Sequence, residues 1–67
     1  MFTTYLAAQT QRHDSVGDLA RDATEDPNWP APALDEREVY AGYLNAASAS
    51  NAAIDAFELA WAEYKGR

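Results

Sequence analysis

The sequence predicts an all-α fold: a compact bundle of four to five short helices in a single domain, residues 1–67. Three observations lead to this prediction. Apolar residues recur in several segments at the three- and four-residue spacing of an amphipathic helix. Residues that start and stop helices stand at the ends of those segments. The chain also has two tryptophans, four tyrosines and two phenylalanines, enough large side chains for a small helical core.

The first helix is expected over residues 1–10, with Phe2, Tyr5 and Leu6 on one side. Isolated helices shorter than about 12–15 residues are marginal in water. Docking of these three side chains against the rest of the protein must therefore hold this helix in place.

The second helix is expected to begin at Ser15, whose hydroxyl accepts a hydrogen bond from the amide of Asp18. It ends at Asp26, because Pro27 disfavours the α conformation in the residue before it. Gly17 in the first turn indicates close approach by another helix. The apolar stripe of this helix comprises Val16, Leu19, Ala20 and Ala23.

A stiff connection over residues 27–33 contains all three prolines, and Trp29 within it is predicted to cover the core. The third helix opens with a capping-box pattern, in which Asp35 is the cap and Glu38 stands three residues on. Its apolar face carries Val39, Tyr40, Tyr43, Leu44 and Ala47. A turn over residues 45–49 follows.

The last helix is expected to begin near Ser50 and to run to Lys65, with Gly66 as its terminator. Its core face carries Ala53, Ile54, Phe57, Ala60, Trp61 and Tyr64. Leu59 projects from another side of this helix. It is either covered by a neighbouring element or an exposed apolar contact, and lone exposed leucines are common.

Eleven acidic residues against five basic ones give the chain a formal net charge of −6. Binding to a phosphate backbone depends on Lys and Arg side chains, and the five here are scattered, so the charge disfavours a nucleic-acid partner. The chain has no cysteine, no run of about 20 apolar residues and no basic-then-apolar leader. We therefore expect a cytoplasmic protein that does not bind membranes.

Asp14, Asp18 and Asp22 recur every four residues and form one acidic edge of the second helix, which Glu25 and Asp26 extend. A solvated helix face is the simplest interpretation. The alternatives are a docking face for a basic partner, mimicry of nucleic-acid phosphates and a weak divalent-ion site. The ion site is disfavoured because a calcium loop needs alternating oxygen ligands and a glycine on a turning backbone.

The sequence offers no recognisable set of catalytic residues. His13 is the only histidine, and neither a second histidine nor a cysteine is present to form a metal or catalytic site with it. Ser15 and Ser50 are explained as helix caps, and three glycines are too few for a phosphate-cradling loop. We therefore expect a protein that is not an enzyme and that uses no cofactor and no metal.

Two sequence runs carry a family resemblance. They are DSVGDLARD at residues 14–22, followed by Asp26 and Trp29-Pro30, and AFELAWAEY at residues 56–64. With these runs the chain resembles the YozE family of small bacterial proteins over nearly its whole length. The resemblance implies a fold like that of the sterile alpha motif (SAM-like), in a bacterium or its phage. Trp29 and Tyr5 replace the phenylalanine and tryptophan expected there, and both keep an aromatic ring. The family supplies no catalytic residue.

We therefore expect a non-enzymatic, acidic protein–protein interaction module, whose biological role the sequence leaves open. Its partner is expected to be a protein, and a basic one. The candidate partner-binding residues are Asp14, Asp18 and Asp22 on the acidic edge, or Leu59 on a separate surface of the last helix. Two alternatives stay open: a nucleic-acid-binding domain, and an acidic inhibitor, phage-encoded or not, that mimics nucleic acid.

Overall fold

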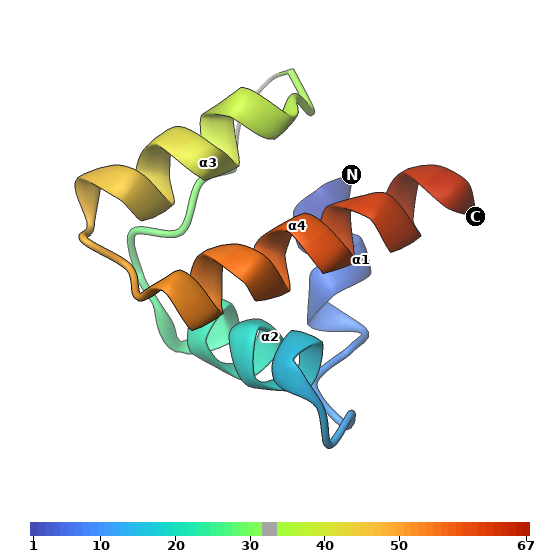
Figure 1. Ribbon diagram of the computed structural model, residues 1–67. Helices are drawn as coiled ribbons and strands as arrows, with labels where there is room; N and C mark the ends of the chain where they lie inside the picture. The colour runs from blue at the N-terminus through green and yellow to red at the C-terminus, as the bar shows by residue number, and fades with distance from the viewer. Residues whose placement is uncertain (32–33) are drawn as a thin grey trace.

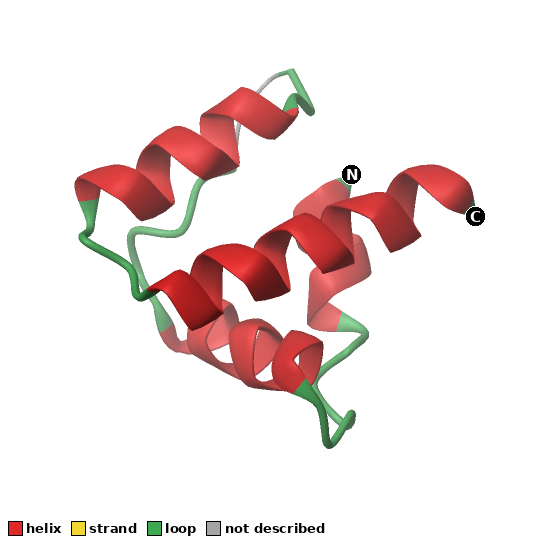
Figure 2. Ribbon diagram, viewed as in Figure 1, coloured by secondary structure: helices red, strands yellow, loops and turns green. Residues whose placement is uncertain are grey.

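Helices account for all the regular structure in the computed structural model, which describes residues 1–31 and 34–67. Over these residues the chain forms α1 (Phe2–Ala7), α2 (Ser15–Glu25), α3 (Arg37–Ala46) and α4 (Asn51–Gly66). The other described residues are loops and turns, with no strand among them (Figure 2). The longest helix, α4, packs against each of the other three (Figure 1). The predicted all-α fold is confirmed.

The core is centred on Phe2, which is fully buried. Its ring centroid lies 4.9 Å from that of Tyr40 on α3, and 5.6, 5.1 and 5.6 Å from those of Phe57, Trp61 and Tyr64 on α4. Aromatic pairs at such separations add roughly 0.5–1.5 kcal/mol each beyond area burial. Because α1 has only six residues and is too short to be stable alone, this aromatic cluster holds it in place.

The predicted apolar faces reach the core on all four helices. Their buried members are Phe2, Leu6, Val16, Leu19, Ala20, Tyr40, Leu44, Phe57 and Ala60. On α3 the predicted face is too wide, since Val39 is 37% exposed and Ala47 is also exposed. Only Tyr40 and Leu44, four residues apart on one side of α3, are buried.

The predicted capping role of Asp35 is wrong, and the structure gives this residue a larger one. Helix α3 begins at Arg37, and its N-cap Glu36 makes no side-chain capping bond. The two Asp35 carboxylate oxygens instead accept hydrogen bonds from the Phe2 amide, at 3.0 and 3.1 Å. They also accept from the hydroxyls of Tyr40, at 2.9 Å, and Tyr64. One carboxylate thus links the segment before α3 to α1, α3 and α4.

The start of α2 also differs from the prediction. The N-cap is Asp14 rather than Ser15, and its Oδ1 accepts a hydrogen bond from the amide of Gly17 at 3.0 Å. The close approach predicted at Gly17 is made by the loop before α2 and not by another helix. A Cβ at Gly17 would stand 2.1 Å from the carbonyl oxygen of Arg12, so the incoming loop occupies that space.

The remaining boundaries shift by a few residues. Helix α1 ends at Ala7, three residues early, while α4 begins after the predicted cap Ser50, whose hydroxyl accepts from the Ala53 amide at 3.1 Å. Helix α4 includes Gly66 rather than stopping before it.

Trp29 is half-buried and its ring packs edge-on against Tyr43, as expected of a residue that covers the core. Residues 32–33 of the predicted connection lie outside the described residues.

In the described part of the chain, no helix has both the length and the apolar composition that crossing a membrane demands.

Alanine substitutions at Gly17 and Gly42 should change stability in opposite directions. The Gly17→Ala methyl group would collide with backbone, so we expect it to lower the free energy of unfolding by about 1–3 kcal/mol. Gly42 lies within α3 with open space around it, so Gly42→Ala should raise that free energy by roughly 0.5–1 kcal/mol. Urea unfolding followed by circular dichroism measures both changes. A Gly17→Ala variant as stable as the parent would show that the loop does not approach α2 this closely.

Asp35→Asn should destabilise the protein at neutral pH and much less in strong acid. Burial would raise the pKa of Asp35, but hydrogen bonds from Tyr64, the Phe2 amide and Tyr40 hold it below its usual value. The ionised carboxylate therefore stabilises the fold fully above the unfolded pKa of about 3.9, and this contribution disappears as the pH falls through the lower folded pKa.

We expect Asp35→Asn to cost about 1.5–3 kcal/mol at pH 7, as is usual for hydrogen bonds to a charged group. Asp55→Asn is the matched control. Asp55 is exposed on α4 and its side chain makes no hydrogen bond or ion pair within the described residues, so its change should stay within about 0.5 kcal/mol. Unfolding free energies measured across the acid range test this, and equal effects of the two substitutions would refute the role of Asp35.

Candidate interaction surface

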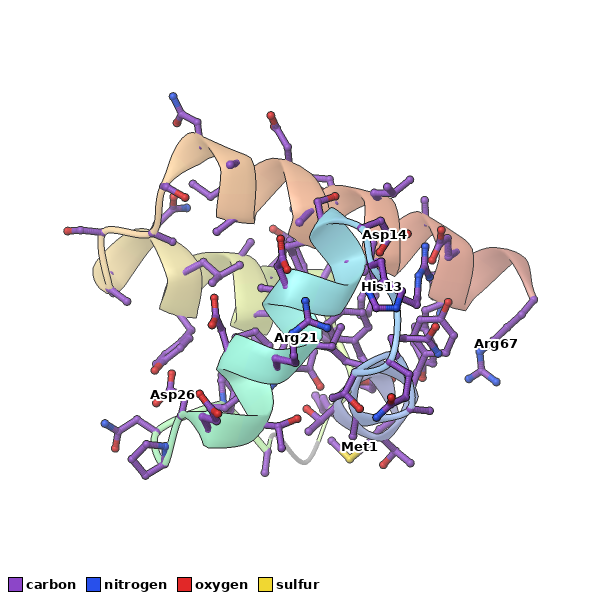
Figure 3. The ribbon with its side chains drawn as sticks, turned by 90° about the horizontal axis from the view of Figure 1, so that it is seen from below. Met1, His13, Asp14, Arg21, Asp26 and Arg67 are labelled. Atoms are coloured by element: carbon purple, nitrogen blue, oxygen red, sulfur yellow. The ribbon has the colours of Figure 1, made fainter. Side chains whose placement is uncertain are left out.

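The acidic edge predicted from the sequence lies along α2. Figure 3 shows this helix from Asp14, at its start beside α4, to Asp26 at its far end, with Arg21 between them. Asp14, Asp18 and Asp22 are all exposed. Their surroundings differ, however, and the differences decide which of these carboxylates is free to meet a partner.

Asp14 is already bonded within the protein. Besides capping α2, its Oδ2 accepts from the guanidinium of Arg12 at 2.7 Å. Arg12 in turn pairs with Glu63 of α4, also at 2.7 Å. The hydrogen bond from Arg12, followed by that from the Gly17 amide, lowers the pKa of Asp14. This carboxylate therefore helps to anchor the start of α2 to α4.

The negative charges of Asp18 and Asp22 are compensated by basic side chains to different degrees. Asp18 forms an exposed ion pair with Arg21 one turn later, and such pairs are typically worth less than about 1 kcal/mol. Asp22 pairs with no basic side chain among the described residues. The last turn of α2 also contains no basic residue. Negative charge on the edge is therefore least compensated toward the C-terminal end of α2.

A shallow hollow runs beside this edge, between α2 and the first turns of α4. Its volume is about 160 Å³. Four residues from each side line it: Ser15, Asp18, Leu19 and Asp22, and across from them Ser50, Ala52, Ala53 and Ala56. The α4 side is built from small residues, mostly alanines, which leave room between the helices.

A second hollow of about 270 Å³ continues the first toward the turn between α3 and α4. The two share Leu19, Asp22, Ser50 and Ala53, so they form one groove, which we call the α2 groove. The second hollow adds mainly apolar residues: Ala23, Trp29, Tyr43, Leu44, Ala47 and Ala49, together with Asp26.

Asp26 closes the far end of the α2 groove. Its Oδ2 accepts a hydrogen bond from the hydroxyl of Tyr43, and its Oδ1 accepts from the Asn28 amide at 2.9 Å. These bonds, that from Tyr43 first, lower the pKa of Asp26, and the same bond raises the pKa of Tyr43. The carboxylate is thus held ionised at the rim.

Leu59 is 49% exposed, so the structure places it on the surface rather than under another element. Its position on α4 relates it to the groove. The residues 52, 56, 59 and 63 follow one another at helical spacing; Ala52 and Ala56 line the groove, and Glu63 bonds to Arg12. Leu59 therefore lies on the same stripe of α4, one turn beyond the groove.

Sequence reasoning treated the acidic edge and Leu59 as separate surfaces and missed the alanines that join them. The available signal was the cluster Ala52, Ala53 and Ala56 at the start of the last helix. These residues fit a helix interior equally well. Only the packing of α2 on α4 turns them into the wall of a groove.

The described residues contain no group of three or more His, Cys, Asp or Glu side chains arranged to hold a metal ion. His13 is exposed in the loop before α2 (Figure 3). The α2 groove itself offers a partner an apolar lining and a rim of three carboxylates, those of Asp18, Asp22 and Asp26.

The chain was compared with protein families, with curated proteins and with solved structures. No curated protein and no solved structure matched it. The family model described as the YozE SAM-like fold matches residues 2–66. Since this match covers nearly the whole chain and agrees with the all-α structure, the protein belongs to the YozE family with its SAM-like fold.

Proposed function

We propose that this protein is a non-enzymatic protein–protein interaction module that works in the bacterial cytoplasm, and that its contact surface is the α2 groove. One observation carries the proposal: an apolar groove lies open beside exposed carboxylates, of which Asp22 has no basic partner among the described residues. Apolar grooves with a polar rim are typical of contact sites.

The distribution of charge supports a basic protein as the partner. The chain carries a formal net charge of −6, and its groove rim is acidic. Opposite charges on two surfaces speed their encounter and fix their orientation, more than they add raw affinity. A partner with a basic surface would therefore be captured faster than a neutral one of similar shape.

The basic residues do not supply the cationic surface that a nucleic-acid-binding domain requires. Arg12, Arg21 and Arg37 each pair with carboxylates. At the end of α4, the Lys65 ammonium lies over the rings of Trp61 and Tyr64. The Arg67 guanidinium lies over the rings of Tyr5 and Tyr64. This arrangement supports a protein partner over nucleic acid.

Affinity capture from a lysate of the native host tests the proposal, with proteins identified by mass spectrometry. The parent chain is compared with Asp18→Lys/Asp22→Lys, which reverses the groove rim, and with Glu36→Lys/Asp55→Lys, an equal charge change at exposed residues outside the groove. We expect a partner that the parent and the control retain and the groove variant loses. Circular dichroism verifies folding, and Asp22→Lys alone serves should the double variant unfold.

Retention of every captured protein by the groove variant would contradict the proposed surface. Adding DNA to the capture separates the remaining classes. A basic DNA-binding protein that DNA displaces would indicate an inhibitor that mimics nucleic acid. Direct retention of DNA by the chain at about 50 mM salt would indicate a nucleic-acid-binding domain.

A further inference from the structure

The α2 groove has features that select one kind of partner, and this inference rests on the interaction role proposed above. We propose that the groove binds a basic amphipathic helix of another protein. That helix would place one aliphatic side chain in the larger hollow and lysine or arginine side chains against the carboxylates of the rim.

The larger hollow has the size and lining of a pocket for one side chain. Its volume of about 270 Å³ lies below the roughly 300–1,000 Å³ of sites that enclose small ligands. Its apolar lining comprises Leu19, Leu44, Trp29, Tyr43 and four alanines. Leu19 and Leu44 belong to the buried core, so the floor is fixed before a partner arrives. A protruding aliphatic side chain fits such a hollow.

The rim carboxylates stand at helical spacing. Asp18 and Asp22 are four residues apart on α2, and Asp26 follows four residues later as its C-cap. One helical turn rises about 5.4 Å. Cationic side chains one turn apart on a second helix lying along the groove can therefore meet successive carboxylates, which accept several hydrogen bonds each.

The charge at the end of α2 is unfavourable in the free protein. The C-terminal end of a helix carries partial negative charge, which basic residues normally offset. Here Asp22, Glu25 and Asp26 gather at that end, and the last turn has no basic residue. A cationic partner would relieve this repulsion. The repulsion arises at the helix end and does not depend on the shape of the groove, so it supports a basic partner independently.

The probe for the test is a synthetic amphipathic helix with leucine on one face and lysine on its flanks. It is titrated into the full-length ¹⁵N-labelled chain while amide chemical shifts are followed. We expect shifts confined to the segments around residues 18–26 and 47–53. The same peptide with alanine in place of leucine keeps the charge and should lose the binding. A peptide with glutamate in place of lysine should not bind.

Two variants of the chain separate the groove from general electrostatics. Asp22→Lys should weaken binding by at least about tenfold, because it places like charge in the groove. Glu25→Lys makes the same charge change one turn away. Glu25 lines a different depression, with Thr10 and Arg21. This variant therefore changes the charge at the helix end without entering the groove, and it should weaken binding clearly less than Asp22→Lys does. Both positions are exposed, and spectra of the free variants verify their fold.

Equal weakening by Asp22→Lys and Glu25→Lys, or equal binding of the alanine peptide, would overturn the inference. Amide shifts of the groove residues that depend on the concentration of the chain itself, without peptide, would also overturn it. Such shifts would assign the groove to a second copy of the chain. If lysate capture still yields a partner that needs the rim carboxylates, the proposed function survives this failure. Should the capture fail as well, both are refuted.

Discussion

The carboxylate of Asp35 and the ring of Phe2 together hold this small fold closed. Asp35 accepts hydrogen bonds from the Phe2 amide and from tyrosines on α3 and α4, while Phe2 itself fills the centre of the aromatic core. A chain of 67 residues without cysteine has no disulfide to reinforce a limited core. Here the reinforcement comes from an acceptor placed where the N-terminal helix meets the other two.

This arrangement leaves α2 free to carry a function. Helix α2 packs on the rest of the protein through Val16, Leu19 and Ala20, all buried. Its acidic side takes part in the fold at the two ends, through Asp14 and Asp26, so Asp18 and Asp22 bear charges that the fold does not require. Unfavourable charge at the end of α2 is then tolerated, because the aromatic cluster and Asp35 lie on other elements.

The parts of the structure that follow from local pattern were predictable. The buried stripe of α2, the Ser50 cap of α4 and the covering role of Trp29 each depend on neighbouring residues or on size. Asp35 was not predictable, since an aspartate three residues before a glutamate satisfies the capping-box pattern. Of its three donors, Tyr40 lies five residues away, but Phe2 and Tyr64 lie 33 and 29 residues away, and no local pattern encodes these two.

The candidate surface was predictable only in part. The spacing of Asp14, Asp18 and Asp22 placed them on one edge. Sequence could not show that Arg12 and Gly17 bond to Asp14, while Asp22 pairs with no basic side chain in the described part of the chain. The α2 groove depends on two helices meeting across small residues. Alanines at positions 52, 53 and 56 have the same pattern whether they are buried or line a groove.

The most direct test of the account is the pKa of the Asp35 side chain, measured from its carboxyl carbon chemical shift across the acid range. The account predicts a pKa below the usual value of about 3.9 for aspartate, with the Phe2 amide shift following the same titration. A pKa at or above that value, or a Phe2 amide that ignores the titration, would show that Asp35 does not join the helices.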